Sequence, residues 1–323
     1  QIIFGLFALG VSFFLWMYGY HNLVKNSSYL LLGCIFLLII VFLPKIGHEI
    51  NGAKRWVNFF GASFQPSELA KYIIPLFFIN KMINQNIQNI SFFKLLKILF
   101  VLSIPLVLIF FEPDNGTCAL IIFSFIILFV LTKIKLIYWA LPLLVISIIG
   151  IGIASNMNYV KDRVKIYMHP ERDIFGKGHQ PYQAKIATGS GRILGRGLGN
   201  SLQKHNYLPE ARSDYIAAIY AEEFGFLGIC FMLVLYMIVA FCGFSIAMKA
   251  IDKSGFYLAT IITFLISFQA FLNLGVVSGL LPSKGIALPF FSQGGSSLFV
   301  NILALCILLK ISYISKKESF VNE

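Results

Sequence analysis

The chain has 323 residues, of which 58% are hydrophobic and 12% are charged, and its mean hydropathy is +0.81. A soluble domain carries about 25% charged residues, roughly twice the share found here. With repeated apolar runs of ~20 residues, the length that crosses a bilayer, this composition excludes a soluble enzyme, a coiled coil and a disordered chain. The net charge of +12 is therefore interpreted by its location in loops, and no basic face for nucleic acid is visible.

The sequence predicts an all-α polytopic membrane protein that forms one domain over residues 1–323. Apolar spans are expected at residues 1–19, 28–45, 67–83, 94–111, 116–132, 135–154, 215–246, 255–278 and 296–314. The span 215–246 is longer than one crossing requires, which predicts a tilted or bent helix.

The basic residues of the loops predict the orientation. With the first span starting outside, the inside segments hold Lys25, Lys81, Lys94, Lys97, Lys133, Lys135, Lys249, Lys253, Lys310, Lys316 and Lys317. The short outside loops hold Lys45, Lys54, Arg55 and Lys284. Because basic residues concentrate on the cytoplasmic side, the N-terminus is expected outside and the C-terminus in the cytoplasm. An outside start with an odd span count, and Gln1 in place of Met, predict a further helix upstream.

The segment 155–213 is then a large extracytoplasmic loop. It is charged and rich in glycine, and loops of this length in a compact protein are usually functional or disordered. Short amphipathic helices are expected within it, around 158–168 and 180–192.

Ionisable residues within or beside apolar spans are the first functional hypotheses. Glu68 and Lys71 are three residues apart, so they share a helix face and can pair, either as a structural ion pair or in a polar cavity. Asp114 and Asp214 each precede a span, where a carboxylate can cap the helix or serve a site. Asp214 is also suited to act as a general base. The Glu222–Glu223 pair lies deeper and favours helix packing.

The segment from Leu281 to Ser297 contains prolines and glycines at membrane depth, where irregular backbone must be protein-buried or line a cavity. Backbone N–H groups near Gly294–Ser297 either form a plain capping turn or bind phosphate. No Rossmann, P-loop or zinc motif is present, and the five cysteines read as buried apolar residues.

Six motifs occur in a characteristic order: Asn51-Gly-Ala-Lys-Arg-Trp56, Gln65-Pro-Ser-Glu68 with Lys71, Pro113-Asp114-x-Gly116, Tyr207-Leu-Pro-Glu-Ala-x-Ser-Asp214, Glu222-Glu223-x-Gly225 and Ser292-x-Gly-Gly-Ser-Ser297. Together they resemble the SEDS family (shape, elongation, division and sporulation), over almost the whole chain. Leu208–Ala211 and Pro282–Gly285 are more similar to its division branch than to its elongation branch.

The resemblance implies a SEDS-type helical bundle of ten transmembrane helices, of which this chain would contain nine and lack the first. It also implies a peptidoglycan glycosyltransferase of the bacterial cytoplasmic membrane that polymerises lipid II, the undecaprenyl diphosphate-linked precursor. The implied partners are a class B penicillin-binding protein, other division proteins and membrane lipid. No cofactor is evident. A divalent cation that serves at the diphosphate stays an alternative, although the sequence shows no dedicated site for it.

The resemblance also assigns site residues. Asp214 matches the family's essential aspartate and would act as the general base on the acceptor hydroxyl. Glu68, Lys71 and Asp114 match the polar central cavity. The resemblance places Arg55, Gln180, Lys204 and Ser296 near the diphosphate or sugars. From the chemistry of the reaction, which needs positive charge near the leaving diphosphate, the candidates are Arg55, Arg196, Lys204 and Arg212. Arg212 stands where His is common in the family.

Two other functions compete with the polymerase. A lipid II flippase or other transporter would also use Glu68, Lys71 and Asp114, as a proton or ion relay. A non-catalytic scaffold would only position a penicillin-binding protein. The large outside loop ending at Asp214 favours chemistry on the outer face.

Overall fold

The computed structural model describes residues 1–44, 46–50, 53–59, 62–84, 90–156, 166–169, 173, 176, 178–204, 207–283 and 285–321. The chain divides into two compact units. Unit 1 consists of Gln1–Leu136, Val239–Ile266 and Gly294–Glu323, and unit 2 consists of Ile137–Ile238 and Ser267–Gln293. Three of the boundaries fall within helices: one after the first residue of α7 (Leu136–Asn156), and the others inside α10 (Ile216–Met248) and α11 (Lys253–Val277).

Each predicted span coincides with a helix in the described part of the chain. Besides α10 and α11, these helices are α1 (Ile2–Tyr18), α3 (Ser27–Val41), α4 (Pro66–Ile83), α5 (Phe92–Phe111), α6 (Asn115–Leu131), α7 (Leu136–Asn156) and α12 (Gly295–Val321). By length and hydropathy, α5, α10, α11 and α12 can cross a membrane, and α1, α3 and α6 are shorter apolar helices. The fold is therefore mostly helical, and the full number of crossings stays a prediction.

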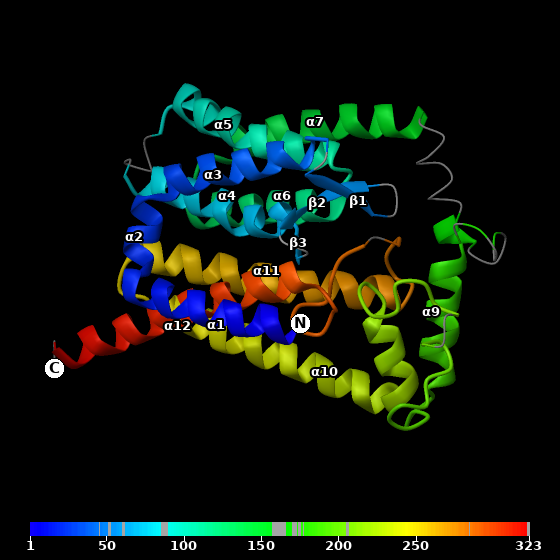
Figure 1. The fold of residues 1–323 in the computed structure, drawn as a ribbon. Coiled ribbons are helices and arrows are strands. Elements are labelled where there is room, and N and C mark those ends of the chain that lie inside the picture. Colours follow the sequence, from blue (N-terminus) through cyan, green and yellow to red (C-terminus); the bar gives the residue numbers. More distant parts are fainter. Residues whose placement is uncertain are drawn as a thin grey trace. The chain divides into compact units, whose positions relative to one another are not determined.

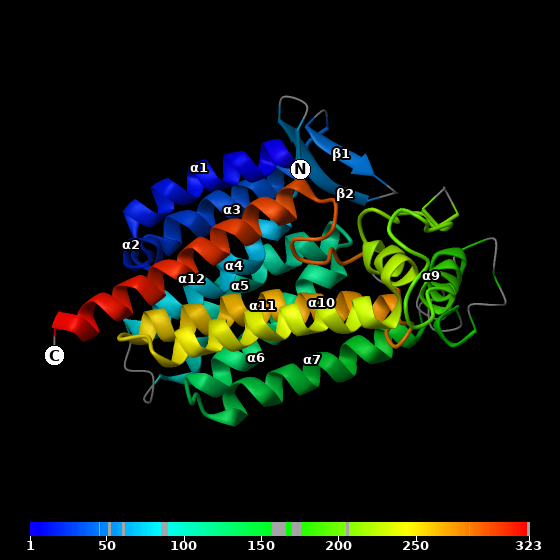
Figure 2. The same ribbon diagram turned by 90° about the horizontal axis from the view of Figure 1, so that it is seen from below.

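Helix α4 forms the centre of unit 1. It packs against α3, α5, α6 and α12, while α12 also lies along α1 (Figures 1 and 2). The ring of Phe78 packs against the rings of Phe125 and Phe129 in T-shaped contacts, with centroid distances of 5.5 and 5.4 Å. This is a favourable geometry for aromatic rings. Because neighbours surround α4, its polar side chains are buried together with its apolar ones.

The expectation of an all-α chain is wrong at residues 47–50, 53–59 and 62–64, which form a three-stranded antiparallel sheet in unit 1. The strands are β1 (Gly47–Ile50), β2 (Ala53–Phe59) and β3 (Ala62–Phe64), in the order β1-β2-β3, with Gly47 opposite Val57 and Val57 opposite Phe64. Along β2, the buried residues Ala53 and Val57 lie on one face, whereas Lys54 and Asn58 are exposed on the other. This period of two is typical of a strand with one covered face.

Strand β2 is tied to the turn between α5 and α6. The Arg55 guanidinium donates to the carbonyl oxygens of Glu112 (3.0 Å) and Pro113 (2.7 Å). The Glu112 side chain is fully buried, and neither carboxylate oxygen has a hydrogen-bond partner within the described residues. Burial raises the pKa of this carboxyl from 4.5 to about 8, with Asp114 adding to the rise and Arg55 opposing it.

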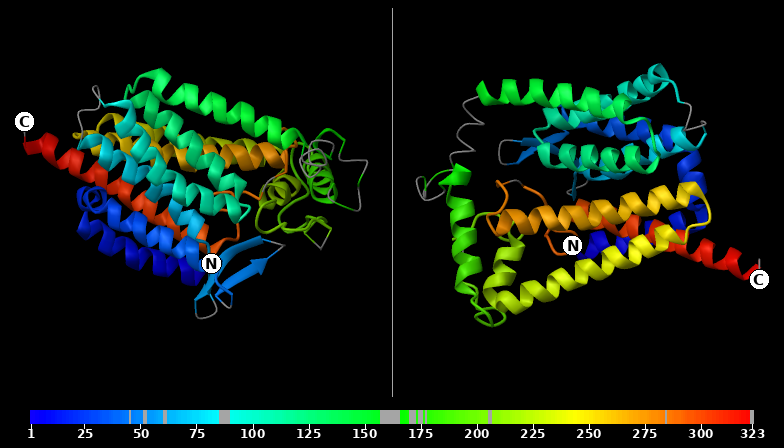
Figure 3. Two further views of the ribbon diagram at one scale, coloured as in Figure 1. Left: turned by 90° about the horizontal axis from the view of Figure 1, so that it is seen from above. Right: turned by 180° about the vertical axis from the view of Figure 1, so that it is seen from behind.

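In unit 2, helix α9 (His179–Ser190) packs against the first part of α10, as Figure 3 shows. Its alanines Ala184 and Ala187 are fully buried in one cluster with Ala217 and Ala218 of α10. Such small residues allow two helices to approach closely. Helix α9 confirms the helix expected around 180–192, whereas most of the one expected around 158–168 lies outside the described residues.

Helix α10 is bent at Gly225, which confirms the bend expected in the long span 215–246. Gly225 has φ 67° and ψ −162°, a conformation that essentially only glycine adopts. The loop at 192–197 fills the break: Phe226 and Leu227 donate their N–H groups to Arg192 and Ile193, at 2.9 and 3.2 Å. In return, Arg196 and Gly197 donate to the carbonyls of Glu222 and Glu223, at 3.0 and 2.9 Å. The loop therefore supplies the hydrogen bonds that the broken helix lacks.

The buried Glu112 predicts a pH dependence of stability. Between pH 4.5 and about 8 the native chain holds a proton on Glu112 that the unfolded chain has released. The free energy of unfolding should therefore fall as pH rises through this window and level off above it. Glu112→Gln keeps the shape of the side chain and is neutral at every pH, so the variant should not show this fall in the free energy of unfolding. Thermal unfolding in detergent across the window measures it, and parallel curves for the two proteins would contradict the account.

The bend at Gly225 predicts a large cost for Gly225→Ala. A Cβ there would lie 2.3 Å from the Gly195 nitrogen and 2.5 Å from the Ile193 oxygen. We expect a loss of more than about 2 kcal/mol in the free energy of unfolding. Gly33→Ala is the matched control, because a Cβ at this helical glycine meets nothing within 4 Å. Equal thermal stability of the two variants would show that the bend does not depend on glycine.

Candidate functional site

Unit 1 contains a buried ion pair on α4. Lys71 donates to Oε2 of Glu68 at 2.5 Å, and the lysine is fully buried while the glutamate is 8% exposed. The spacing of three residues places both on one helix face, as the sequence predicts. Pro66 and Glu68 occupy the first turn of α4, where the helix dipole favours the carboxylate. A buried pair of this kind costs desolvation, so its contribution to stability alone is a weak reason for its presence.

Asp114 is the centre of a second group in the same unit. Its Oδ2 accepts from Gln65 Nε2 at 3.0 Å, from Ser67 Oγ at 2.8 Å and from Thr117 Oγ1 at 2.8 Å. Its Oδ1 accepts from the backbone N–H of Thr117 at 3.3 Å, which makes Asp114 the N-cap of α6. The capping role is therefore present, and the same carboxylate links the start of α4 to the start of α6.

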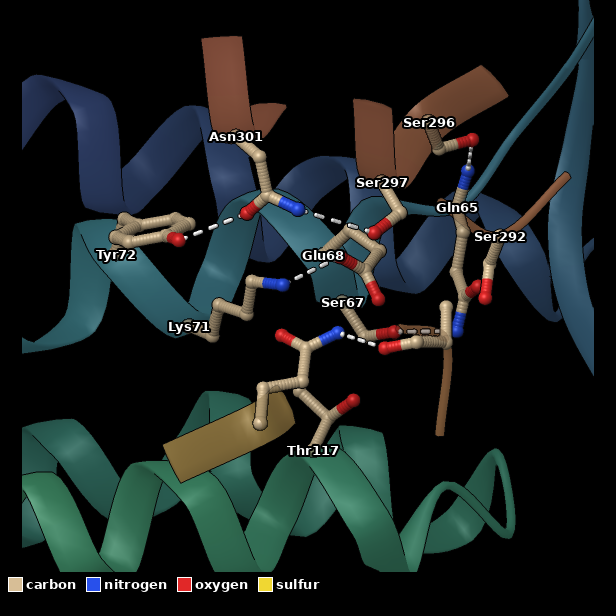
Figure 4. Close-up of polar contacts among 12 residues, drawn as sticks. Gln65, Ser67, Glu68, Lys71, Tyr72, Thr117, Ser292, Ser296, Ser297 and Asn301 are labelled. Carbon is tan, nitrogen blue, oxygen red and sulfur yellow. Dashed lines mark hydrogen bonds and ion pairs between the residues drawn. The ribbon is translucent and has the colours of Figure 1, made fainter. Parts of the chain in front are cut away.

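Helix α12 adds three polar side chains to these groups (Figure 4). The Ser296 hydroxyl accepts from the backbone N–H of Gln65 at 3.0 Å and donates to the Ser63 carbonyl at 3.3 Å. Asn301 accepts from the Tyr72 hydroxyl at 2.9 Å and donates to Ser297 Oγ at 3.3 Å. The structure therefore gathers the predicted residues Glu68, Lys71, Asp114 and Ser296 around the start of α4. Arg55 of β2 is hydrogen-bonded to the turn that precedes Asp114.

In unit 2, Asp214 lies where the loop enters α10, and its side chain is half-buried. Asn273 of α11 and a second segment, residues 286–293, hydrogen-bond to the backbone around Asp214. Asn273 Nδ2 donates to the Asp214 carbonyl at 2.8 Å, Ser292 Oγ donates to the Ser213 carbonyl at 2.6 Å, and the Gln293 N–H donates to the Arg212 carbonyl at 2.8 Å. Three consecutive carbonyls thus have defined partners, which fixes the direction in which the Asp214 side chain leaves the backbone.

Two features border the Asp214 side chain. A Cβ at Gly285 would lie 2.8 Å from Oδ2 of Asp214, so a larger residue there would displace this carboxylate oxygen. Arg212, two residues earlier, is exposed, and its guanidinium has no ion-pair or hydrogen-bond partner among the residues that the structure describes. The site therefore combines a held carboxylate with a cation that is available to a ligand.

Two of the predicted diphosphate contacts are paired within unit 2. Arg196 lies 3.5 Å from the carboxylate of buried Glu222, and Lys204 lies 3.0 Å from that of Glu223. Glu222 also accepts from Ser201 Oγ at 2.6 Å and from two backbone N–H groups. The acidic pair therefore anchors the loop 196–204, in line with the packing role that the sequence favoured. The role of Arg196 and Lys204 toward a substrate stays a prediction.

Gln180 lies apart from these contacts, half-buried in the first turn of α9. For a cation, the described residues offer no group of three or more His, Cys, Asp and Glu side chains. Sequence reasoning missed Asn273 and Asn301, both buried polar residues in otherwise apolar helices. The rule that polar residues inside a membrane segment are functional hypotheses would have found them.

Comparison with known proteins identifies the family of the chain. The family model for FtsW, RodA and SpoVE, described as a cell cycle protein, matches residues 1–317. A Buchnera aphidicola protein named probable peptidoglycan glycosyltransferase FtsW is 37% identical over 305 residues, covering 92% of this chain and 85% of the relative. Stage V sporulation protein E of Bacillus subtilis is 33% identical over 319 residues, covering 98% and 87%.

A solved structure is similar over nearly the full length. Its description is "Structural coordination of polymerization and crosslinking by a peptidoglycan synthase complex". The similar chain has a TM-score of 0.76 and 25% identity, and the match covers 97% of this chain and 88% of that one. The family match over residues 1–317 and the two relatives lead to one conclusion: this chain belongs to the FtsW/RodA/SpoVE family.

Proposed function

We propose that this protein is a peptidoglycan glycosyltransferase of the division branch, which polymerises lipid II into glycan strands with Asp214 as the general base. The observation that carries the proposal is the position of Asp214: its side chain is half-buried at the junction of the loop and α10, and the backbone carbonyls of residues 212–214 are each hydrogen-bonded. The names of the relatives and the motif 207–214 support the reaction class.

The chemistry of glycosyl transfer accounts for both groups at this site. Asp214 accepts the proton of the acceptor hydroxyl while that oxygen bonds to the anomeric carbon of the donor sugar. The bond from this carbon to the lipid diphosphate breaks, and the diphosphate departs with the electron pair. General base catalysis of this kind contributes about 10²–10⁴-fold. A guanidinium that meets the diphosphate stabilises the developing negative charge. Arg212 is suited to this, because it is exposed and pairs with none of the residues that the structure describes.

The proposal also includes the setting of the enzyme. Residues 155–213 and Asp214 lie on the extracytoplasmic face of the bacterial cytoplasmic membrane, with the C-terminus in the cytoplasm. A class B penicillin-binding protein is the proposed partner, because the similar solved chain belongs to a complex that couples polymerization to crosslinking. The division branch is supported by Leu208–Ala211 and Pro282–Gly285 and by the relative named FtsW.

Asp214→Asn tests the general base. In liposomes with the penicillin-binding partner, its transpeptidase blocked, and labelled lipid II, the wild type should produce glycan ladders. The variant keeps the size of the side chain but is a far weaker proton acceptor, so we expect ladder formation to slow by about 10²–10⁴-fold. Ladders at the wild-type rate would refute the role of Asp214. If neither protein forms ladders but both move lipid II across the bilayer, the flippase reading would replace the polymerase.

Arg212→Gln tests the cation. Loss of a charge-assisted contact costs about 1.5–3 kcal/mol, so kcat/KM for lipid II should fall roughly tenfold or more in Arg212→Gln. Arg212→Lys keeps the charge and should retain part of the wild-type kcat/KM. Arg192→Gln is the matched control, because Arg192 is also exposed and lies in the same unit. Equal effects of the two Gln substitutions would indicate a general loss of positive charge and no specific contact.

A further inference from the structure

The side chain of Asn273 connects two segments that border Asp214. It lies on α11, is 2% exposed, and belongs to unit 2 with both of its partners. Its Nδ2 donates to the Asp214 carbonyl at 2.8 Å and to the Ile286 carbonyl at 2.7 Å. One amide nitrogen therefore bridges the start of α10 and the segment 286–293.

The chemistry of the two partners fixes the orientation of the amide. Backbone carbonyls only accept hydrogen bonds, so the NH₂ group of Asn273 must face them and uses both of its hydrogens. The Oδ1 atom points elsewhere and has no partner within the described residues. A carboxylate at this position would place two acceptors against two acceptors, and a hydroxyl would supply only one hydrogen.

The bridge controls both sides of the Asp214 carboxylate. One bond holds the backbone that carries this side chain, and the other holds Ile286, next to the glycine whose Cα approaches Oδ2 of Asp214. Tyr236 and Gln269 also bind the segment, at the Pro289 carbonyl (2.6 Å) and the Ala287 carbonyl (2.8 Å). Neither of these two bonds involves the backbone of Asp214, so Asn273 has a role that they do not share.

We propose that Asn273 is the positioning residue for the general base, setting the distance and direction of the Asp214 carboxylate toward the acceptor hydroxyl. This inference rests on the proposed function of Asp214. Misplacing a catalytic group by about 1 Å can cost on the order of 10²-fold in rate without weakening substrate binding. Asn273 therefore acts on kcat through Asp214 and does not contact the sugar or the diphosphate.

The test uses the full-length protein with its penicillin-binding partner in liposomes, with lipid II as substrate and the transpeptidase blocked. Asn273→Ala and the isosteric Asn273→Asp should each lower kcat by about 10–100-fold while KM for lipid II stays within about twofold. Tyr236→Phe is the matched control: it removes one bond to the same segment but none to Asp214, and its kcat should stay within about twofold of the wild type. Thermal unfolding measures whether each variant is folded, and co-purification measures whether it binds the partner. Each rate is then expressed per amount of folded, partner-bound protein.

A double variant separates positioning from general stability. If Asn273 acts only through Asp214, adding Asn273→Ala to Asp214→Asn should cause no further loss of kcat. A further tenfold loss would overturn the proposal, as would a wild-type kcat in both Asn273 single variants or an effect confined to KM. If Asp214→Asn itself keeps the wild-type rate, the proposed general base fails. If Asp214→Asn is impaired and the Asn273 variants are not, only the inference about Asn273 fails.

Discussion

The structure depends on one constraint: backbone N–H and C=O groups in a water-poor interior must be paired within the protein. A continuous helix meets this requirement by itself, but a break or an irregular segment does not. At Gly225 the four bonds to the loop 192–197 close the gap in α10. At residues 212–214, Asn273 and the segment 286–293 donate hydrogen bonds to three consecutive carbonyls. Both irregular regions are thereby held as firmly as regular structure.

The same constraint decides which charges are available for chemistry. Glu222 accepts hydrogen bonds from backbone N–H groups of the loop 196–204, and Glu222 and Glu223 form ion pairs with basic residues of the same loop. The two carboxylates therefore hold this loop against α10. In unit 1, Glu68 and Lys71 neutralise each other, and Asp114 accepts four hydrogen bonds. Asp214 is held through its backbone carbonyl, and its half-buried carboxylate lies beside Gly285. The bonds to the main chain fix the point and the direction from which this side chain leaves the backbone.

Local features of this fold were predictable from the sequence, whereas pairings between distant segments were not. Apolar length located the helices, and the spacing of Glu68 and Lys71 predicted their ion pair. The sheet was missed because its short strands lie between long apolar runs, although Asn51-Gly52 is a strong hairpin signal. The partners of Arg196 and Lys204 were missed because they lie on α10, 26 and 19 residues further along the chain. Asn273 was missed because one amide in an apolar span identifies no partner.

The central claim is that the held Asp214 carboxylate receives the proton of the acceptor sugar. A structure of the full-length protein with its penicillin-binding partner and two bound lipid II molecules, a donor and an acceptor, tests it most directly. The account predicts the acceptor hydroxyl within about 2.6–3.2 Å of an Asp214 oxygen, or one water away, with the donor's anomeric carbon beyond it. An acceptor hydroxyl held by a different acidic or basic side chain, with Asp214 facing away from both sugars, would contradict it.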